Sequence, residues 1–310
     1  MLSDRALLRV VTGKGGVGKT SVALALALDE AAQGKRVLLA VANAGERGAA
    51  LLGAKPGGGA LRELLPRVHV VDMTPREAMR EYVLLTLRFE SLYQTVFENR
   101  LVKHFLRLVP SLGELVMLGK VWYHVTSPRG TPQRFDVVIL DAPATGHAIA
   151  MLRAPEVVRA TVPAGPMRET ARDMSTMLGD AEHTRLHVVT TPEEMPVAEA
   201  TELEEAARTT LGMRLGVTFI NQRVAPLPSG SLASLARLHT DLDLAPGLAA
   251  LERREARIHM GEEYLARLPQ TMREDSVALP RIVDPHFGRA AIETLARVLA
   301  DRRAVSGGTR

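Results

Sequence analysis

The residues from Gly13 to Thr20 have the types and the spacing of a phosphate-binding loop. They read Gly-Lys-Gly-Gly-Val-Gly-Lys-Thr, which satisfies the pattern G-x-x-x-x-G-K-[ST]. Glycines let successive backbone N–H groups point at phosphate oxygens, and the N-terminus of a following helix adds a partial positive charge. We expect Lys19 to reach the β- and γ-phosphates of a nucleotide and the Thr20 hydroxyl to bind Mg²⁺. The expected phosphate-site residues are Gly13, Lys14, Gly15, Gly16, Val17, Gly18, Lys19, Thr20 and Ser21.

A carboxylate lies at the end of an apolar run farther along the chain. Residues 135–141 read Phe-Asp-Val-Val-Ile-Leu-Asp, which predicts a buried strand with Asp141 at its C-terminal end. Ligands of open α/β sheets bind at this edge, so Asp141 is a candidate for holding Mg²⁺ through a water molecule. His147 follows closely as a candidate general base or metal ligand. No second metal ligand lies beside His147 at the usual spacing, which disfavours a metal site there.

The elements that must position these residues follow from the apolar pattern. A β-branched run at 7–12, an Ala/Leu/Val-rich helix at 20–33 and a buried strand at 36–42 form a βαβ unit. Such a unit implies a mostly parallel sheet with helices on both faces. Further strands are expected at 68–72, 135–140, 186–190, 215–220 and 277–283, and further helices at 197–211 and 287–302. The sequence therefore predicts an α/β fold, and we take residues 1–310 as a single domain.

Residues 75–126 have a different character from the rest of the chain. Leu85, Phe89, Leu92 and Val96 recur at helical spacing, and this segment predicts a helical insertion of two or three amphipathic helices. The excess of basic over acidic side chains lies in residues 75–135, and we favour a solvated helix face for it. An anionic partner, either nucleic acid or the lipid headgroups of a membrane surface, is the alternative.

Composition narrows the classes of protein that are possible. The 310 residues include 46% hydrophobic side chains and carry a formal net charge of +4, as expected of a globular protein with a core. The longest wholly apolar run, Val22–Leu28, is too short to span a bilayer. The sequence contains no cysteine and does not begin like an export signal, so we expect a cytoplasmic protein without disulfides.

Two motifs make the chain resemble a known family. Lys14, an additional lysine early in the loop, resembles the signature lysine of the deviant Walker A group of P-loop ATPases. Residues 141–147, Asp-Ala-Pro-Ala-Thr-Gly-His, are similar to the switch II motif of the arsenical-pump and tail-anchored-protein targeting ATPases. Residues 190–193 (Thr-Thr-Pro-Glu) and Asn221, which ends a predicted strand, also resemble that family.

The resemblance implies a P-loop NTPase fold that uses ATP and Mg²⁺ to switch a dimer between open and closed states. Lys14, Lys19 and Asp141 would then serve hydrolysis, with Lys14 reaching the phosphates of a partner subunit. Thr145, Gly146 and His147 would form the nucleotide-sensing switch, and Asn221 would contact adenine. The partners implied are a second copy or a related ATPase chain, and a protein client or partner at the helical insertion. We do not expect nucleic acid as a partner.

Two departures from the family pattern limit what is implied. Asn43 stands where the family has an aspartate that positions the attacking water, and an amide cannot accept a proton from that water. We therefore expect hydrolysis to be slow, supplied by a partner or absent, with Glu46 as a candidate substitute. The cysteines that bind zinc in the targeting factor or arsenite in the pump are missing, so neither ligand is expected.

Two other functions remain as alternatives. One is a spatial organiser of the division-site or partitioning class, which would use a membrane-binding C-terminal helix or bind DNA. The apolar face of residues 287–302 fits a membrane helix, but that helix lacks a lysine-rich face. The other is a nucleotide-gated binding module that does not hydrolyse ATP, which Asn43 would explain.

Overall fold

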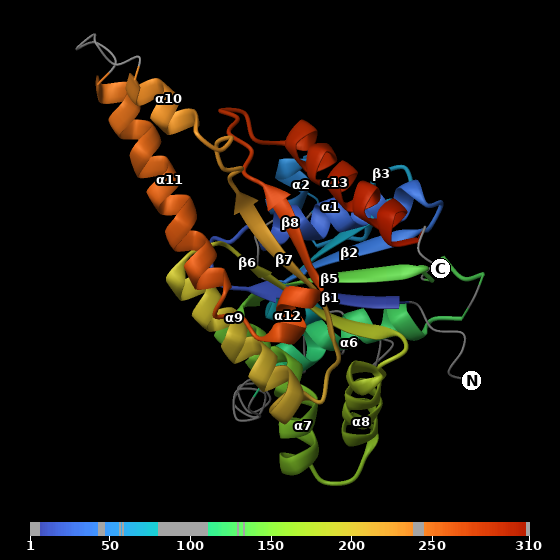
Figure 1. Ribbon diagram of the computed structural model, residues 1–310. Coiled ribbons are helices and arrows are strands. Elements are labelled where there is room, and N and C mark those ends of the chain that lie inside the picture. Colours follow the sequence, from blue (N-terminus) through green and yellow to red (C-terminus); the bar gives the residue numbers. More distant parts are fainter. Residues whose placement is uncertain are drawn as a thin grey trace.

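The computed structural model describes residues 7–42, 47–55, 57, 59–79, 111–128, 130–132, 134–237 and 245–307. A sheet of eight strands runs through this part of the chain in the order β3-β4-β2-β5-β1-β6-β7-β8 (Figure 1). The strands are β1 Leu7–Gly13, β2 Val37–Ala42, β3 Arg62–Leu65, β4 Val68–Met73, β5 Val137–Ala144, β6 Thr184–Thr190, β7 Leu215–Arg223 and β8 Ser276–Pro280. Only β3 pairs antiparallel to its neighbour. The predicted α/β fold with a mostly parallel sheet is confirmed.

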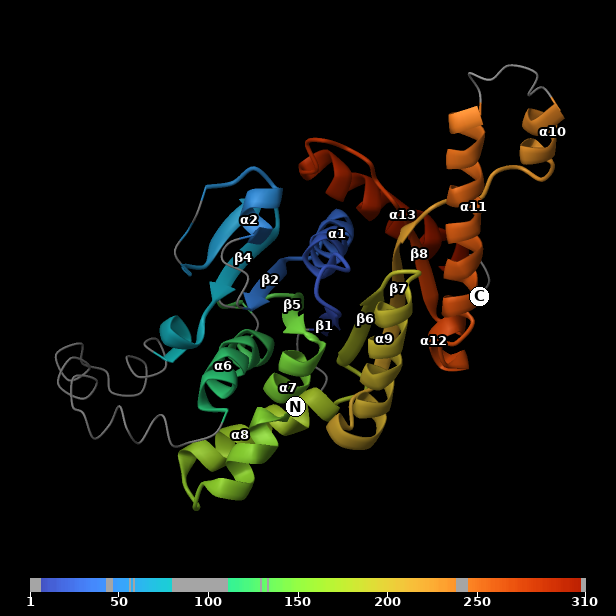
Figure 2. The same cartoon turned by 90° about the vertical axis from the view of Figure 1, so that its left-hand side faces the viewer.

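Helices cover both faces of this sheet, as Figure 2 shows. In the described part of the chain the helices include α1 Lys19–Ala32, α2 Arg47–Leu51, α6 Leu112–Thr126, α7 Thr145–Thr161, α8 Pro166–Gly179, α9 Glu194–Ala206, α10 Ser231–Arg237, α11 Ala245–Leu265, α12 Gln270–Glu274 and α13 Arg289–Gly307, with a π-helical turn at Ala207–Leu211. None of the helices in the described ranges is long and apolar enough to cross a membrane.

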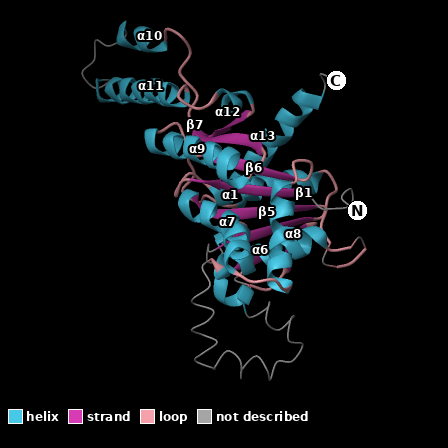
Figure 3. Cartoon of the chain, turned by 90° about the horizontal axis from the view of Figure 1, so that it is seen from below, coloured by secondary structure: helices cyan, strands magenta, loops and turns pink. Residues whose placement is uncertain are grey.

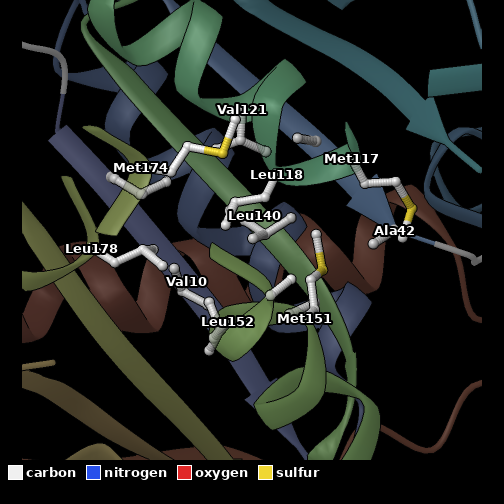
Figure 4. Packing of buried hydrophobic residues seen from close by; sticks show 14 of the residues in the cluster. Val10, Ala42, Met117, Leu118, Val121, Leu140, Met151, Leu152, Met174 and Leu178 are labelled. Atoms are coloured by element: carbon white, nitrogen blue, oxygen red, sulfur yellow. The ribbon is translucent and has the colours of Figure 1, made fainter. Parts of the chain in front are cut away.

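The first face of the sheet is covered by α6, α7 and α8. Met117 and Leu118 of α6, Met151 of α7 and Met174 of α8 pack over Leu140 of β5 in one buried cluster (Figure 4). All five side chains are at most 3% exposed. Burial of this apolar surface holds β5, and with it the following residues, in a fixed position.

The second face is covered by α1 and α13, which pack against each other and against the sheet. The side chains of α1 are apolar almost all round because this helix contacts both the sheet and α13. Ile292, Leu295 and Leu299 of α13 are at most 7% exposed in the same cluster. The predicted apolar face of the closing helix is therefore occupied by the protein's own core. Arg303 adds an ion pair to Asp29 of α1 at 3.0 Å.

A third cluster lies at the end of the sheet that carries β7 and β8. Here α9, α11 and α12 pack together around Leu203 and Leu265, both buried. Only Gly261 and Leu265 are buried along the 21 residues of α11, and α10 and α11 extend beyond the sheet at this end (Figures 1 and 3).

Several elements differ from the sequence-based expectation. The helices α7 and α8 follow β5 where no helix was predicted, and α7 accommodates Pro155 inside its length. Within the segment predicted as a helical insertion, 75–79 and α6 are helical, but residues 80–110 lie outside the described ones. The division into one domain with an insertion at 75–126 stays a prediction.

Candidate functional site

The loop from Gly13 to Thr20 joins the end of β1 to the start of α1. Gly13 has φ 151° and Gly18 φ 90°, a region that side chains rarely adopt. A Cβ atom on Gly13 would lie 2.0 Å from the carbonyl oxygen of Val189, and one on Gly18 would lie 2.4 Å from Nδ2 of Asn221. Both positions therefore require glycine. Because α1 begins directly after Gly18, its first N–H groups are available for a phosphate.

Lys19 closes the loop from its far end. Its Nζ donates a hydrogen bond to the carbonyl oxygen of Lys14 at 3.0 Å. The ammonium group thus lies across the loop, where it joins the backbone N–H groups in a positively charged concavity. This arrangement matches the predicted role of Lys19 with the β- and γ-phosphates.

Thr20 and Asp141 form the candidate magnesium site. The register of β1 with β5 pairs Val11 with Asp141, which brings the carboxylate under the loop. The Thr20 hydroxyl donates to Oδ2 of Asp141 at 2.6 Å, and Asp141 is 2% exposed. A hydroxyl oxygen and a nearby carboxylate are ligands that suit Mg²⁺, which binds few protein oxygens and keeps several waters. These residues therefore fit the ion.

Asn221 lies at the end of β7 and contacts the same loop. Its Nδ2 donates to the carbonyl oxygen of Val17 at 2.8 Å, and both side chains are buried. Beside it lies a cavity of about 310 Å³ that includes Ser21 and Phe287 in its lining. Apolar and amide groups next to a phosphate loop suit a purine base, so this cavity supports the prediction that Asn221 contacts adenine.

The predicted switch residues begin helix α7 directly after β5. The Thr145 side chain is buried, whereas Gly146 and His147 are exposed. The hydroxyl of Thr12, at the end of β1, donates to the carbonyl oxygen of Pro143 at 2.9 Å. This bond ties the start of the phosphate loop to the segment that leads into the switch residues.

Lys14 points to a residue that the sequence did not single out. Its ammonium group forms an ion pair with Oε1 of Glu199 on α9 of the same chain. The hydrogen bond from Lys14 holds the pKa of Glu199 below its usual value, and the hydroxyl of Thr145 and the charge of Lys19 act in the same direction. The loop, the switch and α9 therefore meet at one carboxylate.

Other candidates are not brought to this site. Asn43 and Glu46 lie outside the described residues, which resume at position 47 after β2. His187, four positions after His183, is buried in β6 and does not form a metal pair with it. In the described ranges no group of three or more His, Asp or Glu side chains could hold a metal ion.

Comparison with known proteins agrees with this geometry. The sequence profile of the anion-transporting ATPase family matches residues 7–165, which include the phosphate loop, Asp141 and the switch residues. The chain belongs to this family. It is 29% identical to the ATPase BagA of Mycobacterium tuberculosis over 245 residues, covering 76% of this chain and 71% of BagA. It is 27% identical to the arsenical pump-driving ATPase of Acidiphilium multivorum over 215 residues, covering 64% of this chain and 35% of that protein.

As a member of the family, the chain is an ATPase that binds and hydrolyses ATP. The profile match ends at residue 165, before Glu199 and Asn221. The structure places both of these side chains on the phosphate loop, and so extends the site beyond the matched range.

A larger cavity lies next to the cavity beside Asn221. It encloses about 700 Å³ between α11 and the ends of β7 and β8, and it shares Arg281 and Gln222 with that smaller cavity. Its lining includes the arginines Arg223, Arg253, Arg254, Arg257 and Arg281. Arg223 pairs with Glu262 at 2.6 Å and Arg254 pairs with Glu255, but the five arginines still outnumber these glutamates and Glu193, which leaves an excess of positive charge that suits an anionic group.

Proposed function

We propose that this ATPase is a Mg²⁺-dependent dimeric switch in which ATP closes two related chains onto each other. The observation that carries the proposal is the different placement of the two loop lysines. Lys19 spans its own loop, whereas Lys14 points out of it to Glu199. A lysine outside its own phosphate cradle is available to a nucleotide bound by a facing subunit.

Each residue of the site would then have a defined task. Loop N–H groups and Lys19 would hold the β- and γ-phosphates. Thr20 would hold Mg²⁺ directly and Asp141 through water, and the ion, when bound, neutralises charge on the phosphate oxygens. Water would attack the γ-phosphorus while the bond to the β-phosphate oxygen breaks, yielding ADP and phosphate. Lys14 of the facing subunit would offset the charge that develops, as an arginine finger does.

Turnover is proposed to be slow because Asn43 replaces the aspartate expected from the family resemblance. An amide can orient a water but cannot accept its proton, and loss of such a group commonly costs a factor of about 10² to 10⁴. Complete loss of hydrolysis would leave a nucleotide-gated binding module with the same closure.

Closure is proposed to change the binding of a protein client or partner by the segment 75–126. The described end of this segment, α6, packs directly against α7, whose first residues are the switch. A change at Thr145 would therefore reach α6 through shared core contacts. The proposal places the protein in the cytoplasm, with peripheral membrane contact as a further outcome to test.

The test is the size of the particle in each nucleotide state. Sedimentation velocity of the purified chain with Mg²⁺ and a non-hydrolysable ATP analogue should give a two-fold larger species than ADP does. The same measurement is repeated with any related ATPase chain of the same organism. A particle that stays monomeric in every nucleotide state, alone and with such a chain, contradicts the proposal.

One observation favours a second candidate, an organiser of the partitioning class that binds DNA. The arginines of the larger cavity provide a site for a polyanion. That candidate predicts salt-sensitive co-sedimentation with DNA that Arg253→Glu with Arg257→Glu abolishes. DNA binding that is absent at low salt excludes it. The buried apolar face of α13 gives no support to a membrane-binding C-terminal helix.

A further inference from the structure

Glu199 is the residue at which the phosphate loop, the switch and a helix from the far half of the chain meet. It lies in the second turn of α9, 185 positions after Lys14. Its carboxylate contacts the Lys14 ammonium, and the Thr145 hydroxyl also acts on it. Neither Lys14 nor Glu199 is deeply buried, since their side chains are 31% and 22% exposed.

The ion pair between Lys14 and Glu199 is weak enough to open reversibly. A partly exposed ion pair of this kind is worth at most about a fivefold change in an equilibrium constant. The phosphates of ATP carry several negative charges, and a closed interface excludes water, so they would compete well with one carboxylate for Lys14. Glu199 can therefore bind Lys14 in an open subunit and release it when the dimer closes.

We propose that Glu199 is a positioning residue for Lys14, which it holds within its own subunit until ATP-driven closure transfers the lysine to the partner's phosphates. This inference rests on the dimeric switch proposed above. In a two-fold dimer both subunits must break this contact before closure. Since each contact is worth at most about fivefold, the two together raise the protein concentration needed for closure by up to about 25-fold.

The carboxylate is suited to this task at neutral pH. The hydrogen bond from Lys14 keeps the pKa of Glu199 below its ordinary value, with further help from Thr145. Glu199 is thus ionised at neutral pH while Lys14 is beside it.

The test uses Glu199→Gln, which removes the charge and keeps the shape, with Glu199→Asp as a second variant. Glu202→Gln is the matched control, because Glu202 is an exposed glutamate on the same helix. In the nucleotide-free protein, an amine-reactive reagent read by mass spectrometry should label Lys14 several-fold faster in Glu199→Gln. The rate at Lys14 should be unchanged in Glu202→Gln, and Glu199→Asp should lie between the two.

Closure is then measured by sedimentation with Mg²⁺ and the non-hydrolysable ATP analogue. Glu199→Gln should lower the half-maximal protein concentration for dimer formation, up to about 25-fold, while calorimetry shows ATP affinity within twofold of wild type. In a Lys14→Ala background, where closure is not expected, Glu199→Gln should leave the ATP affinity measured by calorimetry unchanged, because its influence passes through Lys14. A purely structural role would instead weaken ATP binding or act independently of Lys14.

The possible failures are distinguishable. Unchanged labelling of Lys14 in Glu199→Gln overturns the inference, since the contact does not hold the lysine. Faster labelling with unchanged or weaker closure also overturns it, because the contact then does not oppose closure. A wild-type protein that never dimerises contradicts the proposed function and, with it, the transfer step, whereas the labelling experiment still decides whether Glu199 holds Lys14.

Discussion

The two lysines of the phosphate loop bind different partners, and these partners determine which phosphates each lysine can reach. Lys19 bonds to the backbone of its own loop and so stays beside the phosphate cradle. Lys14 is drawn away from the cradle by a carboxylate of α9. Two ammonium groups five residues apart therefore have different partners, and substitutions can test the separate tasks proposed for them.

Lys19→Ala should weaken ATP binding on the order of 10- to 100-fold, because a charged hydrogen bond is worth about 1.5–3 kcal/mol. Isothermal titration calorimetry measures the affinity. The loop conformation depends on glycines rather than on Lys19, so the variant should stay folded by circular dichroism. Lys55→Ala, at an exposed side chain, is the control and should bind as wild type does. Affinity within twofold of wild type in Lys19→Ala would contradict the assignment of the phosphate loop.

Asn43→Asp should raise steady-state ATP turnover, by up to about 10², because it restores a carboxylate where the family resemblance places the water-positioning group. A phosphate-release assay measures the rate. Asn43→Ala is the matched control and should not increase turnover. If wild-type turnover is already fast and Asn43→Asp leaves it unchanged, another residue such as Glu46 or a partner's side chain positions the water.

Local motifs explain why some of these residues could be predicted and others could not. Gly13–Thr20 and Asp141 belong to short contiguous patterns whose residue types state their chemistry. Glu199 is one of several glutamates on and around α9, and nothing in its neighbourhood marks it. Its role depends on the pairing of β1 with β6, which places the start of α9 beside the loop. Such a contact is set by the sheet order and not by local sequence.

At the level of elements, β6 and β7 are joined by a buried histidine. The backbone N–H of Val217 donates to Nδ1 of His187 at 3.0 Å, and the ring leaves no room for a side chain on Gly216, whose Cβ would lie 2.5 Å from Cε1. Burial lowers the pKa of His187 to about 3, and the charge of Arg9 acts in the same direction. The folded protein therefore keeps this imidazole neutral throughout the physiological range.

Stability should fall as the pH drops below about 6.5, because the unfolded chain then binds a proton at His187 that the folded chain excludes until about pH 3. The expected loss in the free energy of unfolding between pH 7.5 and pH 5 is about 2 kcal/mol from this residue. Urea unfolding at several pH values measures it. His187→Gln should flatten the slope, even if it lowers stability overall, whereas exposed His286→Gln should not. An equal slope in wild type and His187→Gln would show that other groups cause the pH dependence.

Elements were predictable where the apolar pattern was strong and continuous. The strand β2 is buried along its whole length, and its run of apolar residues indicated this directly. The helices α7 and α8 were missed because α7 contains Pro155 and begins with Thr145-Gly146, residues that usually indicate a turn. Their helical state depends on packing against α6 and β5, which compensates for poor local propensity.

At the level of the whole molecule, the proposed function depends on whether two chains meet at the edge of the sheet that carries the loop. Lys14→Ala should leave nucleotide binding nearly intact but abolish both ATP-driven closure and hydrolysis. A charge in a water-poor interface contributes about 2–4 kcal/mol, well above the worth of a surface contact. Small-angle scattering with and without the non-hydrolysable ATP analogue measures closure, and Lys35→Ala is the control. A Lys14→Ala protein that still closes with ATP would show that this lysine does not cross the interface.

The weak attachment of α11 has a mechanical consequence. Its 21 residues span about 30 Å, yet it is buried only near its C-terminal end, where Gly261 packs so closely on Pro192 that a Cβ would lie 2.9 Å away. Pro192 lies two residues before α9, the helix that carries Glu199. The geometry is that of a lever whose fulcrum is the contact of Gly261 with Pro192 and whose long arm runs to the N-terminal end of α11. A rotation of about 5° at the fulcrum would displace that end, about 24 Å away, by about 2 Å.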